Sequence, residues 1–308
     1  MTMTLRRCMI ILLSVLFVAS VAMLQTPVPQ TKPNDVIELV PGVYFRHGDL
    51  LGQGHCNNGF VLFDDFVLVI DGNFPNGAEA CMADIKKITN KPVRFVFDTH
   101  HHGDHVYGNR WWMNNGVLPI AHEGVVSEMK RGEPQQWLDT AKGREDVRRL
   151  NQPTAMPPIL TYSDRMVIDD GKRRIEFYYF GIAHTQGDGF AYLPKAKILF
   201  TGDAVVNGPY NYMGGGDSES WIKVIEQLQQ LDVEIVAPGH GPCAGKELLE
   251  QQKQYFLALR QGVAKGIKEG KSLADIQKSI QIPDAVSKFK GDFFPSQIEK
   301  IYKEMRGL

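Results

Sequence analysis

The sequence predicts a mixed fold of strands and helices, of the α/β or α+β class. Two apolar runs at 66–71 and 92–98 have the alternation of strands, and the segment 78–88 between them has helical spacing. A strand, helix, strand order predicts parallel pairing with a right-handed crossover. Several short apolar runs follow between 161 and 202, and helical spacing prevails from 246 onward. These observations predict a fold of strands and helices, and periodicity alone does not decide between the α/β and α+β classes.

The composition is that of an ordinary globular protein. Hydrophobic residues make up 43% of the 308 residues, which is ample for a buried core. Leaving Arg6 and Arg7 out of the 34 basic side chains gives 32 against 35 acidic ones in residues 23–308, a formal charge of −3. We therefore expect no nucleic acid partner.

The first 22 residues have the pattern of a signal peptide. Arg6 and Arg7 precede an apolar run at 8–18, and Ser20 and Ala22 are small residues at the positions that a signal peptidase reads. We expect cleavage after Ala22, a periplasmic or secreted mature protein, and no stable membrane association after cleavage. An uncleaved anchor is the alternative, because the apolar stretch continues to Leu24 and reaches the lower limit for crossing a bilayer. The paired arginines are compatible with either the general or the twin-arginine export route.

The mature chain would keep Cys56, Cys81 and Cys243, an odd number for an oxidising compartment. At least one thiol then has no partner within the chain. A disulfide between Cys56 and Cys81 is compatible with this count. Three cysteines in so long a chain do not predict a disulfide framework.

The first half of the chain alternates strands and turns before its first helix. Residues 23–36 carry three prolines among polar residues and predict an extended linker. Pro41-Gly42 and Asp64-Asp65 are turns between apolar runs, and Gly132-Glu133-Pro134 would interrupt a helical insertion. Besides the strand at 92–98, the strands expected here are 37–40, 43–45, 59–63 and 66–71, and the helices are 78–88, 106–113, 123–130 and 135–150.

The second half repeats the order of strands followed by helices. Asp169-Asp170-Gly171 is a turn between the first two strands, and Asp217 is a suitable N-cap. The Ile282-Pro283 step interrupts the helical tail. The strands expected here are 161–168, 174–180, 189–193, 198–202 and 234–237, and the helices are 218–231, 247–267 and 296–305.

The segment 99–105 reads Thr-His-His-His-Gly-Asp-His and follows directly on the strand at 92–98. The carboxyl ends of strands are where open α/β sheets place their sites. In extended backbone successive side chains alternate sides, so His100 and His102 point one way and His101 the other. His101 is therefore the expected non-ligand.

The same segment has room for a second metal. Gly103 lets the chain bend, after which Asp104 and His105 can face a metal beside the first one. Imidazole and carboxylate ligands without thiolate suit Zn²⁺ first, and iron or manganese tolerates the same set. Three further candidate ligands each follow a predicted strand, namely His184, Asp203 and His240.

These residues resemble the motifs of the metallo-β-lactamase fold superfamily. His100-x-His102-x-Asp104-His105 is its HxHxDH motif, and further matches lie at 181–185 (Gly-Ile-Ala-His-Thr), 201–203 (Thr-Gly-Asp) and 238–241 (Pro-Gly-His-Gly). The matches cover about residues 37–242 in the family's order. The resemblance implies an αββα four-layer sandwich over residues 37–243 and leaves 244–308 as a helical C-terminal extension.

The resemblance also implies a ligand set for two zinc ions. It gives His100, His102 and His184 to the first metal, gives Asp104, His105 and His240 to the second, and has Asp203 bridge both. Asp71 resembles a buried carboxylate of the family that orients a ligating histidine from behind. His47, His55 and His122 match no family position and are expected to be surface or packing residues.

The function that the resemblance implies is hydrolysis of a small-molecule ester, thioester, lactone or β-lactam. A hydroxide held between the metals would be the nucleophile, with Asp104 and Asp203 as the catalytic carboxylates. Asp203 stands where the best-known lactamases have cysteine, which is more similar to glyoxalase II and the lactonases. The alternatives are an oxidoreductase similar to the mononuclear iron persulfide dioxygenases, and a metal-binding accessory protein without turnover.

The segment 207–216 closely follows Asp203 and contains four glycines. Glycines make a loop mobile, and Tyr210 and Tyr212 could cover an apolar group of a substrate. We expect this loop to form a wall or lid of the cleft. The alternative is a plain connection between a strand and a helix.

Overall fold

The computed structural model describes residues 28–308. The predicted signal peptide and residues 23–27 of the predicted linker therefore lie outside the described part of the chain.

Two sheets form the centre of the molecule. The first has seven strands in sequence order, and its last four strands run parallel to one another. The second has six strands in the order β13-β12-β11-β10-β9-β8. The first sheet contains β1 (Val36–Val40), β2 (Val43–Arg46), β3 (Asn58–Leu62), β4 (Val67–Ile70), β5 (Val93–Phe97), β6 (Leu118–His122) and β7 (Leu160–Tyr162). The second contains β8 (Arg165–Asp169), β9 (Arg174–Tyr179), β10 (Gly189–Leu193), β11 (Ile198–Gly202), β12 (Ile235–Pro238) and β13 (Ala244–Gly245).

Both faces of each sheet are buried, which explains why the strands are apolar on both sides. In β4, Leu68 and Ile70 face the other sheet, and Val67 and Val69 face a layer of helices. The strand β10 divides in the same way, because Ala191 and Leu193 point between the sheets while Phe190 and Tyr192 point outward. This alternation is the two-residue period of a strand applied to two cores at once.

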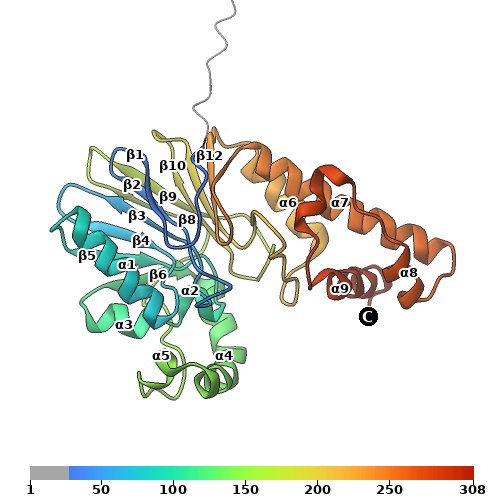
Figure 1. Ribbon diagram of the computed structural model, residues 1–308, viewed down its shortest axis with the longest axis horizontal. Coiled ribbons are helices and arrows are strands. Elements are labelled where there is room, and N and C mark those ends of the chain that lie inside the picture. Colours follow the sequence, from blue (N-terminus) through green and yellow to red (C-terminus); the bar gives the residue numbers. More distant parts are fainter. Residues whose placement is uncertain (1–27) are drawn as a thin grey trace, which may run out of the picture.

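Helices cover the outer faces of the sheets. Figure 1 shows α1 and α3 on one side of the paired sheets, α6 and α7 on the other, and α4 with α5 at one end. The architecture is the expected αββα four-layer sandwich with a helical C-terminal extension. The helices are α1 (Pro75–Ile88), α2 (Gly103–Val106), α3 (Asn109–Asn114), α4 (Glu123–Gly143), α5 (Glu145–Arg148), α6 (Ser218–Leu228), α7 (Glu247–Lys268), α8 (Leu273–Ser279), the 3-10 helix η1 (Asp284–Phe289) and α9 (Phe294–Arg306).

Two of the predicted elements are each divided in the structure. The expected helix at 106–113 is two short helices, because the Gly108 N–H donates to the Asn73 carbonyl at 2.6 Å instead of continuing the helical hydrogen bonds. The expected strand at 161–168 is also two elements. Its first residues belong to β7 in the first sheet and its last to β8 in the second, so the chain changes sheets at Ser163-Asp164.

The helical insertion is not interrupted where we expected. Helix α4 runs through Pro134 and ends at Gly143. Its second half is held by Trp137, whose buried ring lies 4.9 Å from that of Tyr107 and whose indole N–H donates to the Gln152 carbonyl. This packing outweighs the local effect of the proline. The strand β6 directly before the helix was not expected from the sequence.

The C-terminal extension continues the core on the outer face of the second sheet. Phe256, Leu259, Phe289 and Ile298 share one buried cluster with side chains of α6 and of the sheet. None of the helices within residues 28–308 combines the length and the apolar character needed to cross a bilayer.

Candidate metal centre

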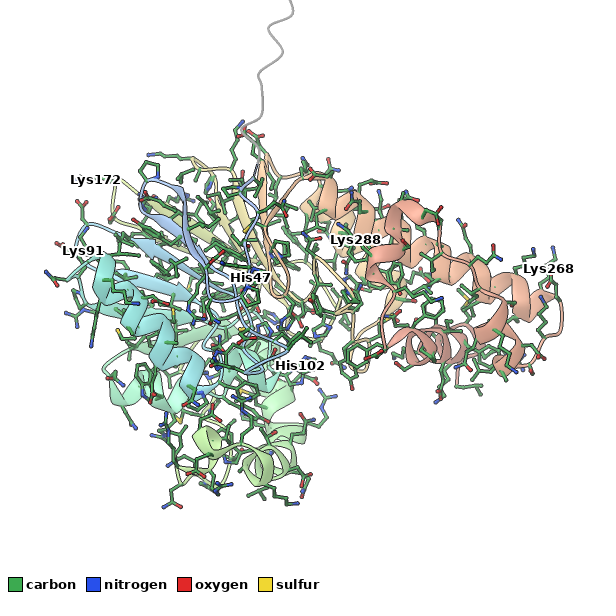
Figure 2. The ribbon with its side chains drawn as sticks, in the orientation of Figure 1. His47, Lys91, His102, Lys172, Lys268 and Lys288 are labelled. Carbon is green, nitrogen blue, oxygen red and sulfur yellow. The ribbon has the colours of Figure 1, made fainter. Side chains whose placement is uncertain are left out.

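All seven predicted metal ligands meet at one edge of the sandwich. His100, His102, Asp104 and His105 follow β5 in the first sheet, and the other three ligands follow β9, β11 and β12 in the second. Because β11 and β12 are parallel, the residues after them emerge at the same edge. Figure 2 shows His102 at the lower end of the sandwich, opposite to Lys172.

Two glycines allow the strand ends that carry the ligands to approach one another closely. Gly202 has φ of +50°, and a Cβ on it would lie 2.3 Å from Thr99 Oγ1. A Cβ on Gly239 would lie 2.1 Å from the Asp203 carboxylate. Side chains at these positions would push the ligands apart, which gives the Thr-Gly-Asp and Pro-Gly-His sequences a steric reason.

The first ligand group consists of His100, His102 and His184. His102 Nδ1 lies 3.1 Å from His100 Nε2 and 2.9 Å from His184 Nε2. His184 Nδ1 lies 2.8 Å from the Tyr212 carbonyl oxygen, which can only accept, so Nδ1 carries the proton. The Nε2 lone pair of the neutral ring then faces the centre of the group.

A hydrogen bond to Nδ1 also fixes the tautomer of His100. Thr99 Oγ1 donates to Asp71 Oδ1 at 2.7 Å, which leaves its lone pairs to accept from His100 Nδ1 at 3.1 Å. Nε2 of His100 is therefore the unprotonated nitrogen at the centre.

The second group consists of Asp104, His105 and His240. His240 Nε2 lies 3.1 Å from Asp104 Oδ2, and His105 Nε2 lies 3.5 Å from the same oxygen. Asp203 lies between the two groups: its carboxylate oxygens are 3.4 Å from His105 Nε2, 3.3 Å from His240 Nε2 and 3.7 Å from His184 Nε2.

Asp71 supports His105 from behind. This residue has φ of +67°, which directs its carboxylate to His105 Nδ1 at 3.1 Å and to the Thr99 backbone N–H at 2.9 Å. A carboxylate beside Nδ1 favours a proton on that nitrogen, and Nε2 then faces Asp104 and Asp203. The geometry is that expected for an orienting group.

These residues fit divalent metal ions. Ligands of a tetrahedral zinc ion at about 2.0 Å lie about 3.3 Å from one another, which is close to the nitrogen separations in the first group. Nitrogen lone pairs that converge at such distances repel unless a cation lies among them. His105 Nε2 and Asp203 Oδ1 are also buried without a hydrogen-bond partner, as expected of atoms that ligate a metal.

The protonation states of the first group agree with metal binding, whereas nearby acidic groups outweigh burial and raise the pKa of His105 well above its usual value and that of His240 to about 9. Burial lowers the pKa of His100 and His102 well below the usual value, and it also lowers that of His184. The first group is therefore neutral, which is the form that binds metal. Burial alone raises the pKa of Asp203, but His240 and His105 outweigh burial and hold that pKa well below its ordinary value.

His101 belongs to none of the ligand groups, although its side chain is buried. The premise of an extended backbone was wrong, because β5 ends at Phe97 and the chain bends through 99–102. Bending nevertheless leaves His100 and His102 together and His101 outside the cluster.

The other histidines have packing roles, as expected. The His122 ring stacks on Tyr179 with centroids 3.7 Å apart, and its Nδ1 accepts from the Gly124 N–H at the start of α4. His55 is buried, and His47 is half-buried and hydrogen-bonded to Thr31.

The cysteines do not form the disulfide that their count allows. Cys56, Cys81 and Cys243 are all free and buried. Cys81 packs on the outer face of the first sheet, whereas Cys56 lies beside Asp71 and His105 behind the second ligand group. This position of Cys56 could not be predicted from the sequence, because no ligand motif includes it.

Asp188 is a second supporting carboxylate, which we did not identify from the sequence. It accepts hydrogen bonds from the backbone N–H groups of Ala183 and Thr185 and from the Thr185 hydroxyl. These bonds hold the turn that presents His184. Burial raises the pKa of Asp188 to about 7.

A cleft of about 250 Å³ opens over the ligands. Tyr210 and Tyr212 line it, as expected of the loop after Asp203. Leu50 and Phe293 also line it, and we did not anticipate either residue. Phe293 comes from the C-terminal extension, for which the sequence motifs gave no site role.

A larger hollow of about 490 Å³ lies at the opposite end of the sandwich. Three of its five basic side chains are paired with acids: Lys172 with Asp64, Arg174 with Asp169 and Glu176, and Lys197 with Asp232 and Glu234. None of the candidate ligand groups within residues 28–308 lines this hollow, so it is not the candidate site.

A family model described as the metallo-beta-lactamase superfamily matches residues 51–240. Among curated proteins, a metallo-beta-lactamase type 2 from Bacteroides fragilis is 24% identical over 256 residues, which are 79% of this chain and 93% of that protein. A linear primary-alkylsulfatase from Pseudomonas sp. (strain ATCC 19151) is 20% identical over 225 residues, which are 61% of this chain and 42% of that protein.

Solved structures show the same fold. A metallo-beta-lactamase from Pontibacter korlensis superposes with a TM-score of 0.61 and 22% identity, covering 72% of this chain and 98% of that one. The sec-alkylsulfatase Pisa1 from Pseudomonas sp. superposes with a TM-score of 0.67 and 17% identity, covering 89% of this chain. This chain spans about half the length of that alkylsulfatase chain.

Proposed function

Because the chain belongs to the metallo-beta-lactamase superfamily, we propose that it is an exported metal-dependent hydrolase that cleaves a small ester, thioester, lactone or β-lactam. The observation that carries this proposal is the meeting of two ligand groups at one sheet edge with Asp203 between them. Export rests on the signal-peptide pattern of residues 1–22.

The ligand groups would hold two metal ions, zinc first and iron or manganese as possible substitutes. His100, His102 and His184 would hold one ion, and Asp104, His105 and His240 the other, with Asp203 shared. Ions bound there would supply a nucleophile at neutral pH by lowering the pKa of water to about 7, and would polarise the electrophile.

The chain's own residues would orient the reaction. Asp104 is the most exposed of the carboxylates in the ligand groups, and it lines the cleft, so it can accept a hydrogen bond from water there and align it for attack. Asp203 has few exposed atoms and contacts both histidine groups, which keeps their spacing fixed. Asp71 and the Tyr212 carbonyl hold the tautomers of His105 and His184.

Hydrolysis of a sulfate ester is a second candidate function. The match to the sec-alkylsulfatase structure covers 89% of this chain, whereas that to the Pontibacter korlensis lactamase covers 72%. The larger coverage includes part of the C-terminal extension, since residues 244–308 make up about a fifth of the chain. A fold shared at 17% identity does not identify a substrate by itself, so a sulfate ester is included among the substrates to be tested.

The test is a substrate panel on mature protein whose metal content has been measured. It would include 4-nitrophenyl acetate, a thioester, a lactone, nitrocefin and 4-nitrophenyl sulfate. Turnover that chelation abolishes and zinc restores would support a hydrolase. Oxygen uptake with glutathione persulfide, on protein that holds one iron ion, would instead identify the oxidoreductase alternative. Absence of any turnover with metal bound would favour the accessory protein.

A further inference from the structure

The cleft over the ligands has an aromatic wall formed outside the metal-binding motifs. Apart from ligands, its lining consists of Leu50, Tyr210, Tyr212 and Phe293. Tyr212 and Phe293 are 43% and 41% exposed, and their ring centroids lie 5.4 Å apart. Large apolar side chains left exposed beside a reactive site offer a surface that a ligand can cover.

This wall has no cationic group. None of the cleft-lining residues in the described part of the chain is a lysine or an arginine. Lys288, which precedes Phe293 in the extension, donates to Asn207 Oδ1 at 2.9 Å and does not line the cleft. A carboxylate or phosphate on the part of a substrate that lies against the wall would therefore have no charged partner.

The wall is held in place from the C-terminal extension. Gln297 Nε2 in α9 donates to the Asn211 carbonyl at 2.5 Å, and Gln252 Nε2 in α7 donates to Asn211 Oδ1 at 2.6 Å. All three residues are buried. Gly291 packs so closely on Pro209 that a Cβ would lie 2.5 Å from the Pro209 carbonyl oxygen. The loop at 207–216 and the segment that carries Phe293 are therefore one unit.

We propose that Phe293 and Tyr212 form a subsite for an uncharged apolar group of the substrate, an alkyl chain or an aryl ring, whose reacting centre lies over the ligand groups. This inference rests on the proposed hydrolase function and adds the substrate class to it. Both parts share one cleft of about 250 Å³, so the substrate is small. Phe293 is then a specificity-determining residue contributed by the extension.

The test measures binding rather than turnover. Three hydroxamates share one metal-binding head: acetohydroxamate, hexanohydroxamate and the monohydroxamate of succinic acid. Isothermal titration calorimetry on zinc-loaded mature protein gives the Kd of each. We expect hexanohydroxamate to bind about tenfold or more tightly than acetohydroxamate, because its added methylenes leave water. The succinate compound should gain nothing over acetohydroxamate.

Variants then test whether Phe293 and Tyr212 cause the gain in hexanohydroxamate affinity. Phe293→Ala and Tyr212→Ala should each reduce the ratio of the hexano to the aceto affinity by about threefold or more, and Phe293→Leu should retain most of it. Tyr212→Ala keeps the backbone carbonyl that supports His184. The matched control is Leu138→Ala, which removes an exposed apolar side chain on α4 that does not line the cleft.

The outcomes separate this inference from the function on which it rests. If acetohydroxamate binds and hexanohydroxamate gains nothing, the apolar subsite is wrong and the metal centre stands. An equal gain in wild type and Phe293→Ala would also overturn the inference. Failure of acetohydroxamate to bind metal-loaded protein would overturn the metal-dependent function and the subsite together.

Discussion

Asp203 contacts histidines from both ligand groups, so its removal affects two proposed metal sites at once. Asp203→Ala leaves His105, His184 and His240 without the carboxylate they share. We expect this variant to lose metal and to lose about a hundredfold or more of the hydrolytic rate found in the substrate panel.

His101→Ala is the natural comparison, because His101 is a buried neighbour outside every ligand group. We expect it to keep its metal and to keep a rate within a few-fold of wild type. Elemental analysis and kcat/KM for both variants provide the check. Comparable losses in the two would mean that His101 has been wrongly placed outside the site.

Asp188 makes stability depend on pH in a direction that can be calculated. Its pKa is raised from 3.8 to about 7 in the folded protein, so the folded state binds the proton more tightly than the unfolded state. The stabilising contribution is full below pH 3.8 and is lost as pH rises through 7. Between about pH 5 and pH 8 the loss is of order 2 to 3 kcal/mol.

Asp188→Asn tests this dependence because asparagine has a similar shape and no titration. Urea unfolding of metal-free wild type and variant at about pH 5 and about pH 8 gives the comparison. The variant should gain stability relative to wild type as pH rises. A difference that stays constant with pH would show that the carboxyl group is already ionised at pH 5.

At the scale of elements, most strands were predictable because their two-residue period places apolar side chains in two cores. The bounds of β10 and β11 agree with those expected from the sequence. The strand β6 was missed because its Leu-Pro-Ile-Ala-His sequence is short and contains proline, which reads as a break. The path of α4 through Pro134 depends on the tertiary packing of Trp137, which no local pattern contains.

In the candidate site, too, some residues were predictable from the local sequence and others were not. The ligands lie where strand ends predicted them, because the motif residues directly follow apolar runs. Phe293 and Leu50 reach the cleft only through the packing of distant segments, so their sequence surroundings carry no signal. Cys56 and Asp188 likewise became visible only when the fold placed them behind His105 and His184.

Gln297 connects the C-terminal extension to the loop at 207–216. This buried amide donates to the Asn211 carbonyl and accepts from the Tyr255 hydroxyl at 2.6 Å. Gln297→Ala leaves both groups unpaired, at about 1 to 3 kcal/mol each. The loosened loop also carries the Tyr212 carbonyl that supports His184, so zinc affinity should fall about tenfold.

Hydrogen–deuterium exchange over 207–216 and zinc competition with a chelator measure the two effects. Gln277→Ala is the matched control, since Gln277 also donates from the extension to a backbone carbonyl, that of Pro295, but at the surface. Faster exchange in the Gln297 variant alone would support the connection. Unchanged exchange and zinc affinity would show that the extension merely packs beside the loop.

At the scale of the whole molecule, the predicted signal peptide determines where the mature chain begins. The signal-peptide pattern predicts cleavage after Ala22, so protein recovered from the periplasm or the medium should start at Met23. N-terminal sequencing measures this directly. A chain that starts at Met1 in the membrane fraction would favour the anchor instead.

The metal ions would also join the two halves of the sandwich. Four ligands follow the first sheet and three follow the second, and without a cation their lone pairs and carboxylates are crowded and buried. Removing metal should therefore lower the free energy of unfolding by more than a surface site would. A ligand at a thousand times its Kd contributes about 4 kcal/mol for each site, and in a protein of this size that corresponds to a Tm difference of roughly 10 °C or more for two sites.

Scanning calorimetry of mature protein, first stripped with a chelator and then titrated with zinc, tests this prediction. Two sites shared through Asp203 predict that Tm rises until two equivalents per chain are bound and then changes only slowly. The Asp203→Ala variant should show a smaller rise, because it disconnects the groups. A Tm that stops rising after one equivalent, with elemental analysis finding one ion per chain, would remove the two-metal centre and leave a mononuclear site on His100, His102 and His184.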